Sequence, residues 1–303
     1  MRPFAVAGLQ IDVRAKENQV DEIETKIDRL ILHFPWVEMV VLSELAVGTQ
    51  VHADAEPMPG PTEAALARIG AKHGVWFIPG SLYEADGGKI YNTTPVIDPT
   101  GTVIGRHRKL FPFTPYEAGI AAGSEPFVFD VPNVGRFGVL ICYDMWFPET
   151  SRWLITQGVE VILRPALTDT IDREIELAMV RATAAQNQCF VLDVNGLGDG
   201  GVGGSLFVGP AGEVLHQAGS SPEEIPFEID LDRVTRGREV GLRGLGQPLK
   251  SFRDRAFEFD FYAEGAKSDY LNSLGPLEKT QRGSRAGLGD TPSKPRLFGN
   301  TNK

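Results

Sequence analysis

The chain has 303 residues, of which 42% are hydrophobic, and a formal net charge of −10 with an isoelectric point near 5.1. This length accommodates one or two domains with a sizeable core. The acidic balance, without a basic cluster ahead of the tail, argues against a nucleic-acid binder, and no run of about 18 apolar residues would span a membrane.

The N-terminal segment, MRPFAVAGLQIDVRAKENQ, turns polar after one strand's length and lacks the apolar core and cleavage site of a signal peptide. Two cysteines, Cys142 and Cys189, cannot form a disulfide framework and fit a reducing compartment. We therefore expect a cytoplasmic protein. None of the five histidines lies at metal-ligand spacing from another histidine or a cysteine, so we expect no metal site.

Strands and helices alternate along the first part of the chain. Residues 3–13 are apolar and rich in β-formers, and residues 17–34 carry apolar side chains at helical spacing. Residues 37–45, VEMVVLSEL, predict a short buried strand that ends at Glu44. A helix is expected over 61–72, because the proline at its start lacks an N–H that would have no partner there.

The following strands come mostly in hairpin pairs, separated by turn sequences. Strands are expected at 74–84, 89–98, 102–109, 125–132, 135–142, 159–167, 189–196, 203–209 and 210–217, with helices at 148–158 and 172–187. This order predicts an α/β fold in which one mixed sheet, or two sheets, are covered by helices.

The composition changes near the C-terminus. From Lys250 onward charges, Gly, Ser and Pro are frequent, apart from one aromatic cluster, FEFDFY, at 257–262. We expect a domain over 1–249 and a partly flexible, extended C-terminal arm over 250–303. The alternative is a disordered tail, but the aromatic cluster favours an arm that packs on something, such as a partner subunit.

Cys142 occupies a distinctive corner in the stretch GVLICYDMWFPE, where an apolar strand stops and a Pro-Glu helix start follows. A strand-to-helix elbow exposes the thiol and aims the backbone N–H of Tyr143 at the same place. A thiolate so placed attacks a carbonyl or nitrile carbon once a base has taken its proton. The usual base is histidine, and only His107 falls near a comparable strand end. The alternative is an inert buried thiol, which is our interpretation of Cys189.

Two other predicted strands deliver charged side chains at their ends. Glu44 follows an apolar run, where partial desolvation suits a carboxylate to act as a base. Lys109 ends a strand where an ammonium can stabilise an oxyanion. Either residue alone is typical of an ordinary capping or surface charge, but with Cys142 they form a candidate site.

The stretch GLGDGG at 196–201 matches the dinucleotide-binding pattern G-x-G-x-x-G. A nucleotide site of that kind requires a helix next, whereas a strand and a turn are expected here. We interpret the match as a glycine-rich loop.

Five stretches in consistent order, over about residues 3–235, resemble the nitrilase superfamily of carbon–nitrogen hydrolases, in an amidase-like branch. They are SELAVG around Glu44, GRHRKLFPF around Lys109, GVLICYDMWFPE around Cys142, and then AAQNQCFVLDVNG and GGSLFVGPAGEVL. The resemblance implies a four-layer α-β-β-α sandwich, usually dimerised through helices, with no metal or organic cofactor.

The same resemblance implies a role for each candidate. Cys142 would be the nucleophile and Glu44 the general base, while Lys109 and the Tyr143 N–H would hold the oxyanion. Many members carry a second glutamate after the lysine, and in FTPYEAGIAAG that position is Glu117, which would orient the lysine and the substrate.

Tyr143 and Asp144 follow the cysteine as in amidase and carbamoylase branches, whereas nitrile-hydrolysing members tend to show Cys-Trp-Glu. Branches that act on carboxylate-bearing substrates often place an arginine two or three residues after the tyrosine. Met145 and Trp146 stand there instead, which favours an uncharged or apolar group in the pocket.

An arginine from elsewhere in the chain could still replace this clamp, and Arg164 and Arg173 are the candidates, since both lie in ILRPALTDTIDR, the stretch around the end of the next strand. Phe113 and Tyr116 would add pocket walls together with Trp146.

The expected function is hydrolysis of a small aliphatic or arylalkyl primary amide to a carboxylic acid and ammonia through a cysteine thioester. The alternatives are N-carbamoyl amide hydrolysis, which yields an amine, carbon dioxide and ammonia, and then nitrile hydrolysis. A catalytically idle binding or assembly module is a different class, against which the intact Glu44, Lys109 and Cys142 argue. The expected partners are the small-molecule amide and further copies of the chain, as a homodimer or higher oligomer, with no nucleic acid and no membrane.

Overall fold

The computed structural model describes residues 2–48, 52–263 and 265–279. These residues form two compact units. The larger takes in residues up to 112 together with 119–258, and the smaller takes in 113–118 together with the described residues from 259 onward. A domain boundary at residue 249 stays a prediction.

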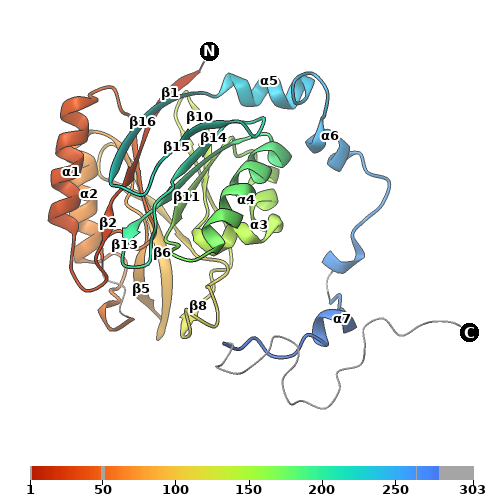
Figure 1. The fold of residues 1–303 in the computed structure, drawn as a ribbon, viewed down its shortest axis with the longest axis horizontal. Helices are drawn as coiled ribbons and strands as arrows, with labels where there is room; N and C mark the ends of the chain where they lie inside the picture. The colour runs from red at the N-terminus through yellow and green to blue at the C-terminus, as the bar shows by residue number, and fades with distance from the viewer. Residues whose placement is uncertain (1, 49–51, 264, 280–303) are drawn as a thin grey trace, which may run out of the picture. The chain divides into compact units, whose positions relative to one another are not determined.

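Two sheets make up the centre of the larger unit (Figure 1). The first follows the order β16-β1-β3-β4-β6-β5, and both β7 and β8 also pair with β6. Its centre is parallel, since β1, β3 and β4 run in one direction, while β16 and β6 run against them. The strands are β1 (Pro3–Gln10), β3 (Met39–Leu42), β4 (Trp76–Ile78), β5 (Leu82–Asp86), β6 (Lys89–Ile97), β7 (Val103–Arg108), β8 (Ile120–Ala121) and β16 (Glu223–Asp230).

The second sheet follows the order β15-β14-β12-β11-β10-β9 and has the same plan, a parallel centre with antiparallel edges. A small additional pair joins β2 to β13. The strands are β9 (Phe127–Val131), β10 (Gly135–Val139), β11 (Val161–Ala166), β12 (Phe190–Asn195), β14 (Leu206–Val208), β15 (Val214–Gln217), β2 (Asp12–Val13) and β13 (Leu197–Gly198).

Helices cover the outer faces of both sheets. In Figure 1, α1 and α2 lie along one side of the pair of sheets and α3 and α4 along the other. The helices of this unit are α1 (Val20–His33), α2 (Pro61–His73), α3 (Pro148–Thr156), α4 (Asp172–Asn187), α5 (Asp232–Val240) and α6 (Pro248–Arg253), with 3₁₀ turns at His52–Asp54 and Cys142–Trp146. Both Pro61 and Pro148 stand at the first turn of their helices, as the sequence predicts.

The alternation of side chains along each strand explains the layers. In β3, Met39 and Val41 join a buried cluster that reaches Val161 and Leu163 of β11 in the other sheet. Their neighbours Val40 and Leu42 point the opposite way into the cluster formed with α1 and α2. In β11 the intervening Ile162 packs with α3 and α4. The expected four-layer α-β-β-α sandwich is therefore confirmed.

The glycine-rich loop at 196–201 contains the short strand β13 and is followed by β14, so no helix takes up the nucleotide-site position. Among the helices within the described ranges, we find none with the length and apolar character needed to cross a membrane.

The smaller unit contains a 3₁₀ turn at Asp260–Tyr262 and the short helix α7 (Asp269–Asn272). Part of the predicted aromatic cluster lies here, where the rings of Phe259, Phe261 and Tyr262 contact one another. Residues 280–303 of the predicted arm lie outside the described residues, and packing of the arm on a partner stays a prediction.

Candidate active site

Cys142 lies at a tight elbow of the chain. The residue comes three positions after β10 and begins the 3₁₀ turn that leads to α3 at Pro148. Its φ angle is +44°, in the left-handed region that side-chain-bearing residues rarely adopt and that occurs more often at functional sites. The residue is 7% exposed, so the elbow buries the thiol instead of exposing it as expected, and its Sγ lies 3.7 Å from Oγ1 of Thr168. The strand stops earlier than the sequence indicates, because the chain leaves the ladder to form this turn.

Glu44 and Lys109 form a buried ion pair. Nζ of Lys109 lies 2.8 Å from Oε1 of Glu44, and the two residues are 2% and 3% exposed. The same Oε1 accepts a hydrogen bond of 2.8 Å from the side-chain amide of Asn92. Asn92 also holds the backbone, since its carbonyl accepts the N–H of Lys109 at 2.8 Å. Strand β6 therefore fixes both members of the pair.

This pair lies within electrostatic reach of the thiol. The backbone N–H of Glu44, in the first sheet's loop, donates to the carbonyl of Ala166 at the end of β11 in the second sheet. Burial raises the pKa of the Cys142 thiol well above its ordinary value, the Glu44 carboxylate raises it further, and the Lys109 ammonium lowers it. Glu44 and Lys109 therefore act on the charge state of the buried thiol, which needs a base before it can attack. The joint action of the three residues in catalysis stays a prediction.

A buried carboxylate ties the elbow to the strand that carries Lys109. Asp144 accepts hydrogen bonds from the N–H of Ile141 at 2.9 Å and from the N–H of Phe111 at 2.8 Å. Its Oδ2 also lies 3.0 Å from Nε2 of His107. His107, the one histidine near a predicted strand end, therefore contacts the carboxylate of the elbow.

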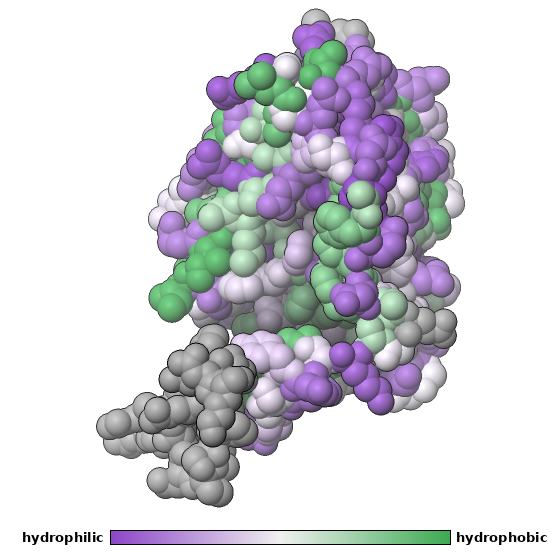
Figure 2. Space-filling model, turned by 90° about the vertical axis from the view of Figure 1, so that its right-hand side faces the viewer, coloured by the Kyte–Doolittle hydropathy of each residue, from purple (hydrophilic) through white to green (hydrophobic). Residues whose placement is uncertain are grey.

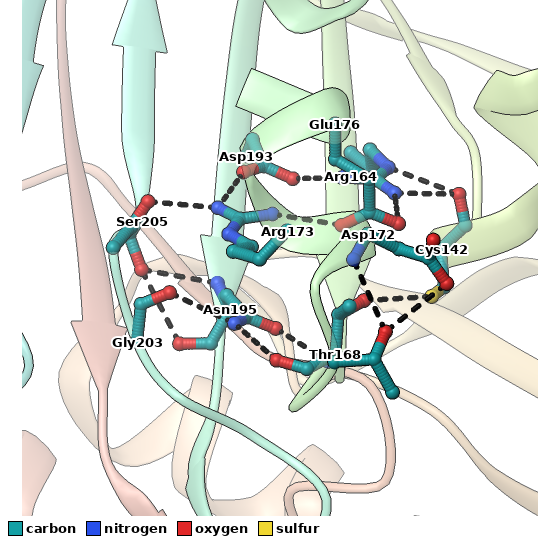
Figure 3. Close-up of polar contacts among 12 residues, drawn as sticks. Cys142, Arg164, Thr168, Asp172, Arg173, Glu176, Asp193, Asn195, Gly203 and Ser205 are labelled. Carbon is teal, nitrogen blue, oxygen red and sulfur yellow. Dashed lines mark hydrogen bonds and ion pairs between the residues drawn. The ribbon is translucent and has the colours of Figure 1, made fainter. Parts of the chain in front are cut away.

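Arg164 and Arg173 lie in buried ion pairs, which argues against the expected substrate clamp. Arg164 is 0% exposed, and its guanidinium bonds Asp193 at 2.5 Å, Glu176 at 2.8 Å and the carbonyl of Cys142 (Figure 3). Arg173 is also buried and pairs with the same two carboxylates. The charges of both arginines are balanced by Glu176 and Asp193.

Asn195 and Thr168, which belong to the buried polar network around Cys142, were not identified from the sequence. Asn195 holds Thr168 in place, because its side chain accepts the Thr168 N–H at 2.8 Å and donates to the Thr168 carbonyl at 3.1 Å (Figure 3). Trp146 was expected as a pocket wall, but its indole N–H donates to Glu176 at 3.2 Å, so its polar edge faces the buried charges.

Glu117, Phe113 and Tyr116 belong to the smaller unit. The Glu117 carboxylate accepts the backbone N–H of Phe113 at 2.5 Å, and the rings of Phe113 and Tyr116 stack at 4.9 Å. Their roles near the substrate stay predictions. Across the described part of the chain, no group of three histidine, cysteine or acidic side chains is arranged to hold a metal ion.

Comparison with known families gives one match, to the family described as carbon–nitrogen hydrolase, over residues 4–239. Among curated proteins, the omega-amidase NIT2 of Xenopus tropicalis is 31% identical over 200 residues, covering 61% of this chain and 72% of that protein. The 2-oxoglutaramate amidase of Bacillus subtilis (strain 168) is 33% identical over 180 residues, covering 57% of this chain and 69% of that protein.

Solved structures share the fold. Nit3 of Saccharomyces cerevisiae, described as a member of branch 10 of the nitrilase superfamily, superimposes with a TM-score of 0.72 at 25% identity and covers 78% of this chain and 94% of its own. A variant of the amidase from Nesterenkonia sp. AN1 in complex with butyramide gives a TM-score of 0.69 at 22% identity, with coverage of 77% and 93%.

Proposed function

This chain belongs to the carbon–nitrogen hydrolase family and is an amide-hydrolysing enzyme of the nitrilase superfamily, and from that premise we propose that it converts a small, uncharged primary amide to a carboxylic acid and ammonia. The observation that carries the proposal is the buried Glu44–Lys109 pair, with 2.8 Å between Oε1 and Nζ, whose two charges act on the pKa of the buried Cys142 thiol.

In the first half of the proposed reaction, Glu44 takes the proton of the Cys142 thiol as the sulfur attacks the amide carbon. The carbonyl oxygen becomes an oxyanion, held by the Lys109 ammonium and the Tyr143 N–H. The carbon–nitrogen bond then breaks, and the nitrogen takes the proton from Glu44 and leaves as ammonia. A thioester on Cys142 remains.

In the second half, Glu44 takes a proton from water, and the resulting hydroxide attacks the thioester carbon. The carbon–sulfur bond breaks from a second oxyanion held by the same donors. The sulfur recovers its proton from Glu44, and the carboxylic acid leaves. A carboxylate is suited to this work because it serves as base and as acid in turn.

The choice of an uncharged substrate rests on the arginines. Arg164 and Arg173 are withdrawn into buried ion pairs, so neither binds a substrate carboxylate. One curated relative is named for 2-oxoglutaramate, whose carboxylate would need such a partner. Butyramide, bound by the Nesterenkonia amidase variant, carries no charge.

Ammonia release from butyramide, 2-oxoglutaramate, an N-carbamoyl amino acid and butyronitrile tests the proposal directly. We expect butyramide to be turned over best and Cys142→Ala to be inactive. Hydroxylamine should intercept the thioester and yield butyrohydroxamate. Release of carbon dioxide from the N-carbamoyl compound alone would favour the carbamoylase alternative, and turnover by the Cys142→Ala variant would exclude the mechanism.

We propose further that the chain works as a homodimer paired through the α3 and α4 layer, in a reducing compartment that keeps both cysteines free. Large apolar side chains are exposed on these helices, Trp153 at 45% and Ile175 at 46%. The face of the molecule viewed from this side carries apolar side chains interspersed with polar ones (Figure 2). Aromatic side chains such as that of Trp153 are enriched in interfaces between subunits.

A further inference from the structure

Arg164 makes an unusual contact with the backbone of the elbow. Its Nε and Nη2 atoms donate hydrogen bonds of 3.0 and 2.9 Å to the carbonyl oxygen of Cys142 (Figure 3). A guanidinium holds its donors in one rigid plane, so two bonds to one oxygen fix the direction of that carbonyl as well as its distance. The carbonyl of the proposed nucleophile therefore points into the buried layer between β11 and α4.

The charge of Arg164 is balanced within that layer. Arg164 of β11 and Asp193 of β12 are directly paired neighbours in the parallel sheet. Helix α4, which covers this sheet, supplies Glu176 and Arg173. Although burial lowers the pKa of Arg164, the carboxylates of Glu176 and Asp193 raise it above its ordinary value. Burial likewise opposes ionisation of Glu176, but Arg164 and Arg173 bring its pKa to about 2. Arg164 and Glu176 thus remain charged at neutral pH, and Asp193 and Arg173 complete the set of buried ion pairs.

Because a peptide unit is planar, fixing the direction of the Cys142 carbonyl also fixes the direction of the N–H in the same unit. The Cys142 carbonyl and the Tyr143 N–H belong to one peptide unit, which is trans because the cis bonds of the described chain lie elsewhere. In a trans peptide the C=O and the N–H point in opposite directions. With the carbonyl held inward by Arg164, the Tyr143 N–H points outward, away from the buried charges.

We propose that Arg164 is a positioning residue that sets the oxyanion donor: by holding the Cys142 carbonyl, it fixes the direction of the Tyr143 N–H toward the substrate oxygen. A cation on the carbonyl also polarises the peptide and makes its N–H a stronger donor. This inference rests on the proposed function, since it assigns a support to the Tyr143 donor used there.

The test compares two reactions of the same thiol. Amide hydrolysis passes through an oxyanion, whereas alkylation by iodoacetamide displaces iodide at a saturated carbon and forms none. We expect Arg164→Lys, which keeps the charge but loses the planar fork, to lower kcat for butyramide by about 10²-fold. Its rate of Cys142 alkylation should match that of the wild type. The charge-balanced double variant Arg164→Met with Glu176→Gln should behave in the same way.

Arg238→Met is the matched stability control, because Arg238 also donates to main-chain carbonyls, those of Gln188 and Val159, remote from the elbow. It should lower the melting temperature and leave kcat unchanged. An Arg164→Lys variant with wild-type kcat would overturn the inference. So would a parallel fall in hydrolysis and alkylation, since that would mean a general disturbance of the thiol.

Failure of the proposed function is recognised separately. If the wild type hydrolyses no amide, butyraldehyde still probes the donor, because it adds to the thiol as a hemithioacetal whose oxygen occupies the oxyanion position. Protection of Cys142 from iodoacetamide by the aldehyde should then be lost in Arg164→Lys. Equal protection of both proteins would overturn the inference about Arg164.

Discussion

Nε2 of His107 lies 3.0 Å from Oδ2 of Asp144, and both side chains are fully buried. This contact joins the end of strand β7, two residues before Lys109, to the 3₁₀ turn that begins at Cys142. The proposed nucleophile and the proposed oxyanion cation come from different sheets, so their separation depends on such a link. The first prediction concerns this carboxylate.

Asp144→Asn should destabilise the protein by about 2–4 kcal/mol, because an amide nitrogen replaces an acceptor that receives backbone N–H groups in a buried site. Urea unfolding measures the change. Asp130→Asn is the control, since Asp130 pairs with Arg136 at the surface and its loss should alter stability little. Equal stability of the two variants would contradict the prediction.

Glu44→Gln should lower kcat/KM by about 10²–10⁴-fold, because an amide cannot move protons between thiol, ammonia and water. Labelling of Cys142 by iodoacetamide should slow as well, because burial still holds the thiol pKa above its ordinary value when the Glu44 charge is lost, and glutamine cannot take the thiol proton. Glu63→Gln removes another buried carboxylate, which pairs with Arg106 at 2.7 Å, and should keep full activity. An active Glu44→Gln protein would exclude this residue as the base.

Lys109→Met should lower kcat by about 10²–10³-fold, the loss associated with one oxyanion donor. The far-ultraviolet circular dichroism spectrum should remain that of the wild type, because Asn92 still bonds Glu44 and the strand order is unchanged. Steady-state kinetics with butyramide measures the effect. A rise in KM with kcat retained would assign Lys109 to substrate binding instead.

Cys189 should make the protein sensitive to alkaline pH. Burial raises the pKa of its thiol to about 12, against the opposing pull of Arg238 and Arg152. Above the ordinary thiol pKa of 9.0 the unfolded chain loses this proton while the folded chain keeps it, so stability falls as the pH rises. Between pH 8 and pH 10 the wild type should lose about 1.4 kcal/mol more than Cys189→Ala, as measured by urea unfolding. If the free energy of unfolding fell equally with pH in the wild type and in Cys189→Ala, Cys189 would not be the source of the alkaline sensitivity.

Trp153→Asp should dissociate the proposed dimer, because it puts a charge on the exposed apolar part of α3. Light scattering after size-exclusion chromatography would give the mass of each variant. Leu32→Asp, on the exposed side of α1, is the control and should leave the mass unchanged. A dimeric Trp153→Asp protein would move the interface away from α3.

The sequence predicts most of the elements, because their signals are local. The helix from Pro61 follows from apolar spacing and its initial proline, and the structure places it at Pro61–His73. The strand ending at Glu44 is shorter, since β3 stops at Leu42 and Leu45 adopts a positive φ of 50°. Nothing in a run of apolar residues marks that turn, which depends on packing against the second sheet.

The buried ion network was missed for a related reason, although a signal exists. Arg164 and Asp193 each interrupt an otherwise apolar strand, and the two strands are consecutive in the sheet. Opposite charges in the middle of consecutive buried strands indicate that they pair. The contribution of Glu176 and the hydrogen bonds to Cys142 require the placement of α4 and of the elbow, which local patterns do not contain.

The hydrogen bond from the Glu44 N–H to the Ala166 carbonyl crosses from one sheet to the other. The proposed catalytic residues therefore lie where the two sheets meet. Each sheet keeps its own interstrand hydrogen bonds when the contact between the sheets is disturbed. Mild denaturant should accordingly abolish activity while the helices and strands remain intact. The rate of turnover would then report how well the two sheets are aligned with each other.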